Sequence, residues 1–123
     1  MGYEVNMQFR DVKFKEKNIP EVEEILQELN ETWQKKSDWC RFDSSLEDIV
    51  EIFEDIGFEL ELDDEFCHVV EFNRQKLGDH ENMFIQLAPY LSDSEIVFHG
   101  EDNDDWKLVF KDGEHERVNR ESL

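Results

Sequence analysis

The chain has 123 residues, the usual length of a single domain, and a formal net charge of −20 from 33 acidic and 13 basic residues. Its hydrophobic content of 38%, with ten Phe and three Trp, is enough for a folded core and argues against disorder along most of the chain. The charge disfavours binding to bare nucleic acid or anionic membranes and favours a basic protein surface.

The sequence also predicts a soluble cytoplasmic protein. Two cysteines, Cys40 and Cys67, do not make a disulfide framework, which suits a reducing compartment. The chain does not open on an apolar signal segment, and no apolar run approaches the roughly 20 residues of a membrane span.

Alternating apolar and polar residues predict a first strand over residues 3–9. Val12 and Phe14 continue the alternation on the opposite parity, which predicts a β-bulge near Arg10 and Asp11. A dense basic segment follows, and its three lysines are expected to face solvent at the end of this strand: Lys13, Lys15 and Lys17.

A first helix is predicted to start at residues 18–21, because Asn18 and Glu21 have capping-box spacing and Pro20 is tolerated in a first turn. Lys35 and Lys36 suit its C-terminal end. Its apolar stripe at helical period is Val22, Ile25, Leu26, Leu29 and Trp33, and its opposite face is Glu21, Glu24, Glu28 and Glu31.

Residues 42–73 contain twelve carboxylates and no Lys or Arg, and the bounding cations are Arg41 and Arg74. More than half of the charge imbalance of the chain lies in this acidic segment. Its members are Asp43, Glu47, Asp48, Glu51, Glu54, Asp55, Glu59, Glu61, Asp63, Asp64, Glu65 and Glu71.

A second helix is predicted inside the acidic segment, capped by Ser44 or Ser45 and ended by Gly57. Its apolar stripe is Leu46, Ile49, Val50, Phe53 and Ile56, and its outer face is Glu47, Asp48, Glu51, Glu54 and Asp55. Acids spaced four residues apart on a helix repel each other, so this face stores unfavourable energy.

The remaining elements are predicted from turn signals. Strands over residues 58–62 and 66–72 flank the turn 63–65, and a third helix starts at Asp79 and ends near Pro89. Strands over 96–101 and 106–111 flank an acidic tip, and Asp112 with Gly113 turns the chain into a last strand over 114–118. Residues 119–123 are expected to fray.

This order, β-α-α-β-β-α-β-β-β, predicts one α+β domain over residues 1–123, with a mostly antiparallel sheet and helices packed on one face. We found no repeat and no linker that would divide the chain.

Motifs for metal or catalytic chemistry are weak. Residues 101–112 resemble a calcium loop, but Trp106 occupies the position where the loop requires Gly, and an acidic solvated tip is the simpler interpretation. The Cys and His residues lack zinc-ligand spacing, and no nucleophile motif or glycine-rich loop is present. We therefore expect no enzyme activity, no metal and no cofactor.

Large aromatic residues usually anchor small cores, so the three tryptophans, Trp33, Trp39 and Trp106, are candidates for the core. For Trp39 we also consider an exposed position, because it lies in a connector outside any periodic stripe and at the edge of the acidic segment. An exposed aromatic residue beside charges is typical of an interface anchor.

Three motifs in the C-terminal part resemble a group of small, acidic, uncharacterised bacterial and phage-associated proteins, over roughly residues 45–115. The motifs are Phe84-x-x-Leu87-Ala88-Pro89-Tyr90, Ser94-Glu95-Ile96-x-Phe98-x-Gly100-Glu101-Asp102 and Trp106-x-x-Val109-Phe110-x-Asp112-Gly113. The resemblance implies an α+β fold and no established activity or catalytic residue. In acidity and size the chain also resembles immunity proteins and phage-encoded inhibitors as classes.

The leading hypothesis is a non-enzymatic inhibitor that docks its acidic surface on the basic, nucleic-acid-binding face of a partner, either as a DNA mimic or as an immunity protein against a nuclease. The alternatives are a generic acidic interaction module or accessory subunit, and acidity that serves only solubility or a high-salt environment. The predicted binding residues are Glu47, Asp48, Glu51, Glu54, Asp55, Glu59, Glu61, Asp63, Asp64, Glu65 and Trp39, with a second acidic tip of Glu101, Asp102, Asp104 and Asp105.

Overall fold

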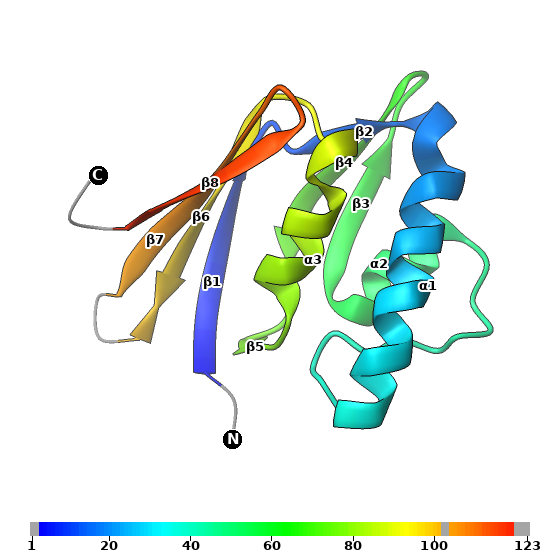
Figure 1. Ribbon diagram of the computed structural model, residues 1–123, viewed down its shortest axis with the longest axis horizontal. Coiled ribbons are helices and arrows are strands. Elements are labelled where there is room, and N and C mark those ends of the chain that lie inside the picture. Colours follow the sequence, from blue (N-terminus) through cyan, green and yellow to red (C-terminus); the bar gives the residue numbers. More distant parts are fainter. Residues whose placement is uncertain (1–2, 102–103, 120–123) are drawn as a thin grey trace.

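The computed structural model describes residues 3–101 and 104–119, and over these residues it has the predicted α+β architecture (Figure 1). The strands are β1 (Tyr3–Arg10), β2 (Lys13–Lys15), β3 (Phe58–Leu62), β4 (Phe66–Phe72), β5 (Lys76–Leu77), β6 (Ser94–Gly100), β7 (Asp105–Lys111) and β8 (Glu114–Asn119). The helices are α1 (Ile19–Lys36), α2 (Ile49–Ile56) and α3 (His80–Leu87), with 3₁₀ turns η1 (Glu16–Asn18) and η2 (Ala88–Tyr90).

The strands form two antiparallel sheets that share one continuous stretch of chain. One sheet has the order β5-β1-β6-β7-β8, and the other has the order β2-β4-β3. The chain passes from the first to the second at Asp11, whose φ of 61° is left-handed. The predicted β-bulge near Arg10 and Asp11 is therefore wrong, because the chain leaves one sheet and enters the other at this point. The Val69 N–H donates to the Val12 carbonyl at 2.9 Å at this junction.

Aromatic side chains from both sheets and from two helices form the core. Phe58 lies at its centre, with ring centroids 5.9 Å from Phe9, 6.3 Å from Phe53 and 5.2 Å from Phe84. These four rings come from β3, β1, α2 and α3, so the core joins elements that are distant in sequence. Both helices therefore share one hydrophobic core with both sheets.

Helix α3 is the link between α1 and the five-stranded sheet, and Figure 1 shows it between them. Trp33 Nε1 on α1 donates to Asp79 Oδ2 at the start of α3, at 2.9 Å. Trp106 Nε1 on β7 donates to Glu81 Oε1 at 3.0 Å, and the Arg117 guanidinium lies 5.1 Å from the Trp106 ring. Trp33 and Trp106 are buried, as predicted.

The predicted cap of α2 is wrong, whereas the predicted start of α1 at Asn18 is confirmed. Helix α2 begins at Ile49 rather than near Ser45, because the Asp48 carboxylate accepts hydrogen bonds from the N–H groups of Val50 (2.8 Å) and Glu51 (3.4 Å). Asn18 does precede α1, but its side chain makes no capping hydrogen bond. The end of α2 at Gly57 is confirmed, with a φ of 124°.

The last hairpin is confirmed, with Asp112 at φ 54° and Gly113 at φ 78° in the turn. Asn119, which was predicted to fray, belongs to β8, and the other residues of that prediction, 120–123, lie outside the described part of the chain. Residues 102–103 of the acidic tip lie outside it as well.

Candidate functional site

The predicted outer face of α2 is only partly a helix face. Glu51, Glu54 and Asp55 lie on the helix and are exposed, whereas Glu47 and Asp48 precede it. Asp48 caps the helix, so its carboxylate has a structural role. No cation lies within α2, as predicted, which leaves the repulsion between its acids unrelieved from within the helix.

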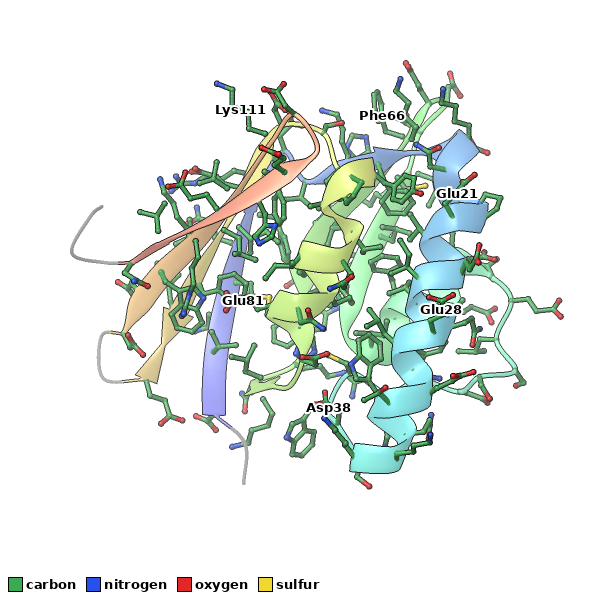
Figure 2. The ribbon with its side chains drawn as sticks, in the orientation of Figure 1. Glu21, Glu28, Asp38, Phe66, Glu81 and Lys111 are labelled. Carbon is green, nitrogen blue, oxygen red and sulfur yellow. The ribbon has the colours of Figure 1, made fainter. Side chains whose placement is uncertain are left out.

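Helix α1 carries a row of exposed acids of its own. The pKa of Glu23 on α1 is raised above its ordinary value. Burial is the larger cause, and the nearby negative charges of Asp48 and Glu47 add to it. Figure 2 shows Glu21 and Glu28 on the same helix. The exposed acids of both helices and their junction are here called the helical acidic surface: Glu21, Glu24, Glu28, Glu31, Glu47, Asp48, Glu51, Glu54 and Asp55.

The helical acidic surface is not neutralised from within the described chain. The ion pairs among the described residues involve other acids, such as Glu4, Glu81 and Glu95. Asp55 is engaged differently, because its Oδ2 accepts the Asp43 N–H at 2.7 Å. The Glu51 and Glu54 carboxylates line a hollow of about 330 Å³ beside that hydrogen bond. They are therefore the acids of α2 that are available to a partner.

The β3–β4 hairpin carries exposed acids, but one of them holds the turn together. Asp63 Oδ1 accepts the N–H groups of Glu65 (2.8 Å) and Phe66 (2.7 Å), and Asp63 Oδ2 lies 2.6 Å from His68 Nε2. These hydrogen bonds lower the pKa of Asp63 to about 2, and the contact with His68 contributes more than either backbone N–H group. Glu59 and Glu61 on β3 are exposed, as predicted.

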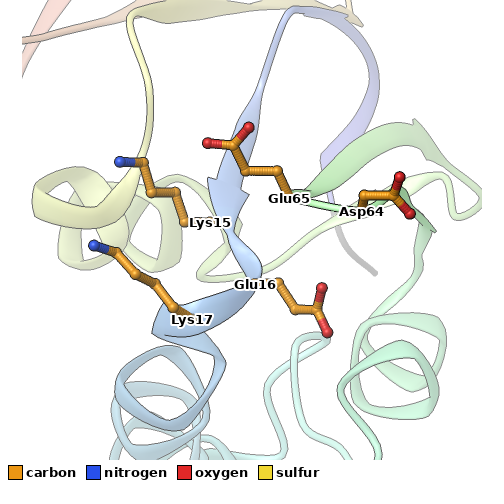
Figure 3. Close-up of a pocket in the computed structure, with 5 residues that line it drawn as sticks. All are labelled: Lys15, Glu16, Lys17, Asp64 and Glu65. Carbon is orange, nitrogen blue, oxygen red and sulfur yellow. The ribbon is translucent and has the colours of Figure 1, made fainter.

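The tip of this hairpin is of mixed charge, which corrects the prediction of a continuous acidic surface. Asp64 and Glu65 line a hollow of about 460 Å³ together with Lys15, Glu16 and Lys17 (Figure 3). The reason is the pairing of β2 with β4, which brings the basic segment next to the acidic turn.

The basic segment itself is not fully solvated as predicted. Lys15 and Lys17 are exposed, but Lys13 is half-buried, with its Nζ 5.1 Å from the centroid of the Phe66 ring and 2.7 Å from Asp11 Oδ1. Sequence reasoning missed this neighbourhood, because nothing local in the chain reports that β2 pairs with β4.

Trp39 is 51% exposed, so the prediction of an exposed aromatic side chain holds. Its neighbours differ from those expected. It lines a hollow of about 330 Å³ with Asn73, Arg74, Gln75 and Lys76, and two of these four residues are cations. The hollow is here called the Trp39 notch, and it is distinct from the carboxylates of the helical acidic surface.

The second acidic tip is described in part. Glu101 Oε1 accepts the Glu4 N–H at 3.0 Å, and Asp105 Oδ1 lies 3.3 Å from His99 Nδ1. Asp104 is exposed, and Asp102 lies outside the described residues. Two of its acids are therefore tied to neighbouring strands.

The thiols and the one buried imidazole are poorly suited to nucleophilic chemistry. Cys40 and Cys67 are fully buried, and burial raises the pKa of the Cys40 thiol and brings that of Cys67 to about 11. A reactive cysteine needs a lowered pKa. Burial lowers the pKa of His80 to about 4. The described residues contain no group of three or more His, Cys, Asp or Glu side chains that could hold a metal ion.

No helix among the described residues is long and apolar enough to cross a membrane. No protein-family model matches the chain, and neither the curated proteins nor the solved structures that were compared with it include a match. The resemblance to small acidic bacterial and phage-associated proteins therefore stays a prediction.

Proposed function

We propose that this protein is a non-enzymatic inhibitor that binds the basic, nucleic-acid-binding face of a partner protein. The observation that carries the proposal is the helical acidic surface, whose exposed carboxylates form no ion pairs within the described chain. Such a surface costs stability through self-repulsion. A basic partner would relieve that repulsion on binding.

The dimensions of α1 suit a groove that binds a duplex. Its exposed acids Glu21, Glu24, Glu28 and Glu31 extend over ten residue steps, or about 15 Å of helix axis. Duplex DNA presents about one negative charge per 1.7 Å of axis, so a groove that accommodates it is lined with Lys and Arg. Rows of carboxylates on two neighbouring helices can occupy that groove in place of phosphates.

Binding rather than catalysis fits the rest of the molecule. Both thiols are buried and hold their protons, and the deeply buried His80 imidazole is neutral at physiological pH. The proposed surface also differs from the predicted one: α1 replaces the hairpin tip, where Lys15 and Lys17 offset Asp64 and Glu65.

The experiment starts with co-purification from the native host and identification of the partner, which should itself bind duplex DNA or RNA. Duplex DNA should then compete with this protein for the partner, and the affinity should fall steeply between low and moderate salt. Affinity that does not change with salt in calorimetry would contradict the proposal. A partner without a basic nucleic-acid-binding face would favour the generic interaction module instead.

Double variants locate the surface. Glu51→Gln with Glu54→Gln on α2, and Glu24→Gln with Glu28→Gln on α1, each remove two exposed charges. Each pair should weaken binding about fivefold, or roughly 1 kcal/mol, while the free protein stays at least as stable. Glu114→Gln with Glu116→Gln on β8 is the matched control, with the same charge change on the far sheet. Equal effects of all three pairs would mean that total charge matters and the helices do not.

A further inference from the structure

The Trp39 notch differs in chemistry from the acidic surface of the rest of the protein. It is a hollow of about 330 Å³ lined by one aromatic residue, Trp39, two cationic residues, Arg74 and Lys76, and two amide residues, Asn73 and Gln75. That volume is at the lower end of the range for small-molecule sites. The notch combines a stacking surface with a cation, which is the combination that recognises a planar anion.

The Trp39 side chain is held in place by a glycine. A Cβ atom at Gly78 would lie 2.9 Å from Trp39 Cβ and 2.3 Å from Asp38 Oδ1, so only glycine permits this close approach. Asp38 Oδ1 in turn accepts the N–H groups of Cys40 and Asp79, both at 2.9 Å, and fixes the connector against the start of α3. Trp39 is thus an exposed indole on a rigid support.

Arg74 is positioned in a similar way. A Cβ atom at Gly57 would lie 2.4 Å from Arg74 Cγ, so the arginine stem crosses the end of α2 directly over that glycine. Its Nη2 donates to the carbonyls of Asp55 (3.3 Å) and Glu54 (3.5 Å), the exposed end of the α2 dipole. Both contacts are long, and within the described residues they use one of its three nitrogens, so donors remain for a ligand.

We propose that the Trp39 notch is a binding site for a small aromatic monocarboxylate. The ring of the ligand would stack on the Trp39 indole, and its carboxylate would accept hydrogen bonds from the Arg74 guanidinium. Asn73 and Gln75 would supply amide hydrogen bonds at the rim. This inference is independent of the proposed docking of the helical acidic surface.

The surrounding charges favour one negative charge on the ligand over two. Lys76 is paired with Glu4 at 3.2 Å, so Arg74 supplies most of the attraction. The neighbouring Glu54 and Asp55 and the net charge of −20 oppose a dianion. A carboxylate is therefore a better match than a phosphate monoester.

The test uses three probes of similar shape: benzoate, its neutral isostere benzamide, and the dianion phenyl phosphate. Binding is followed by ¹H–¹⁵N NMR at the indole N–H of Trp39, which is exposed, whereas Trp33 and Trp106 donate to Asp79 and Glu81 and serve as internal references. Benzoate should shift the Trp39 signal saturably with a dissociation constant on the order of 1 mM, as expected for so small a ligand. Benzamide and phenyl phosphate should each bind at least about fivefold more weakly.

Variants test the two anchors. Arg74→Gln should reduce benzoate binding to the level of benzamide, and Trp39→Ala should abolish saturable shifts at the Gln75 and Asn73 signals. Arg10→Gln removes the same charge from an exposed position on β1 and should leave the dissociation constant unchanged. Shifts that stay linear with benzoate, equal binding of benzamide, tighter binding of phenyl phosphate, or no effect of Arg74→Gln would each overturn the assignment.

Discussion

His80 should make the protein less stable as the pH falls from 7 to 5. The residue is 0% exposed, its Nδ1 accepts the Gly78 N–H at 2.9 Å, and its ring lies against Phe58 and Phe72 at 5.6 and 5.0 Å between centroids. Within the described residues its buried Nε2 has no hydrogen-bond partner. Protonation would place a charge in this aromatic surrounding, so burial lowers the pKa of His80 from 6.5 to about 4.

The size of the effect follows from the two pKa values. The unfolded chain takes up a proton near pH 6.5, but the folded chain does not until about pH 4, so acid favours unfolding in between. At pH 7 this linkage removes only about 0.2 kcal/mol of unfolding free energy, and at pH 5 it removes about 2 kcal/mol. The full stabilisation is present above pH 6.5, and the loss is complete below pH 4.

Urea unfolding, followed by tryptophan fluorescence at pH 7 and pH 5, measures this loss. His80→Asn keeps an acceptor for the Gly78 N–H but does not titrate, so its unfolding free energy should change by about 2 kcal/mol less than that of the wild type. The relief of acidic repulsion at low pH is common to both proteins and cancels. His115→Asn, at an exposed position, is the control and should behave as the wild type. The same pH dependence in wild type and His80→Asn, within about 0.5 kcal/mol, would refute the reasoning.

Three further outcomes are expected. Asp48→Ala removes the cap of α2 and should lower the free energy of unfolding by about 1 kcal/mol in urea titrations. Asp48→Asn keeps a side-chain acceptor and should lower it less. Equal losses in the two variants would mean that the cap hydrogen bonds do not contribute to stability. Glu23→Gln should raise the free energy of unfolding at pH 7, because the raised pKa of Glu23 means that the charged carboxylate is disfavoured in the folded state. The gain over the wild type should vanish below pH 4.5, the ordinary pKa of Glu23, where the carboxyl group is protonated in both states. The purified protein should not shift duplex DNA in a gel at physiological salt, and a tight complex would overturn the proposed function.

Elements with strong local signals were predictable from the sequence. The helical stripe of α1, the end of α2 at Gly57 and the turn at Asp112 and Gly113 depend on neighbouring residues, and the structure confirms them. The start of α2 could not be predicted from the sequence, because Ser44, Ser45 and Asp48 are all good N-cap residues and local preference does not rank them. Ser45 does not cap the helix, because its hydroxyl donates to Asp43 Oδ1 at 2.7 Å.

The candidate site depended more on contacts that are distant in sequence. That the tip at Asp64 and Glu65 lies beside Lys15 follows from the pairing of β2 with β4, about 50 residues apart, and no periodicity reports such a pairing. The burial of His80 likewise follows from packing against β3 and β4. Trp39 could be predicted as exposed, because it fits no apolar stripe, but its cationic neighbours could not.

The edge strand β8 has a consequence for how copies of this protein meet. An exposed strand edge can pair with the same edge of another copy and so extend a sheet between molecules. About a two-fold axis, the residue at the centre of such a pair faces its own counterpart. The central residues of β8 are Glu116 and Arg117. If the axis passes through Glu116, two carboxylates face each other, and if it passes through Arg117, two guanidinium groups do, so like charges lie opposite each other in both cases. In these two registers the facing like charges therefore oppose extension of the sheet through β8.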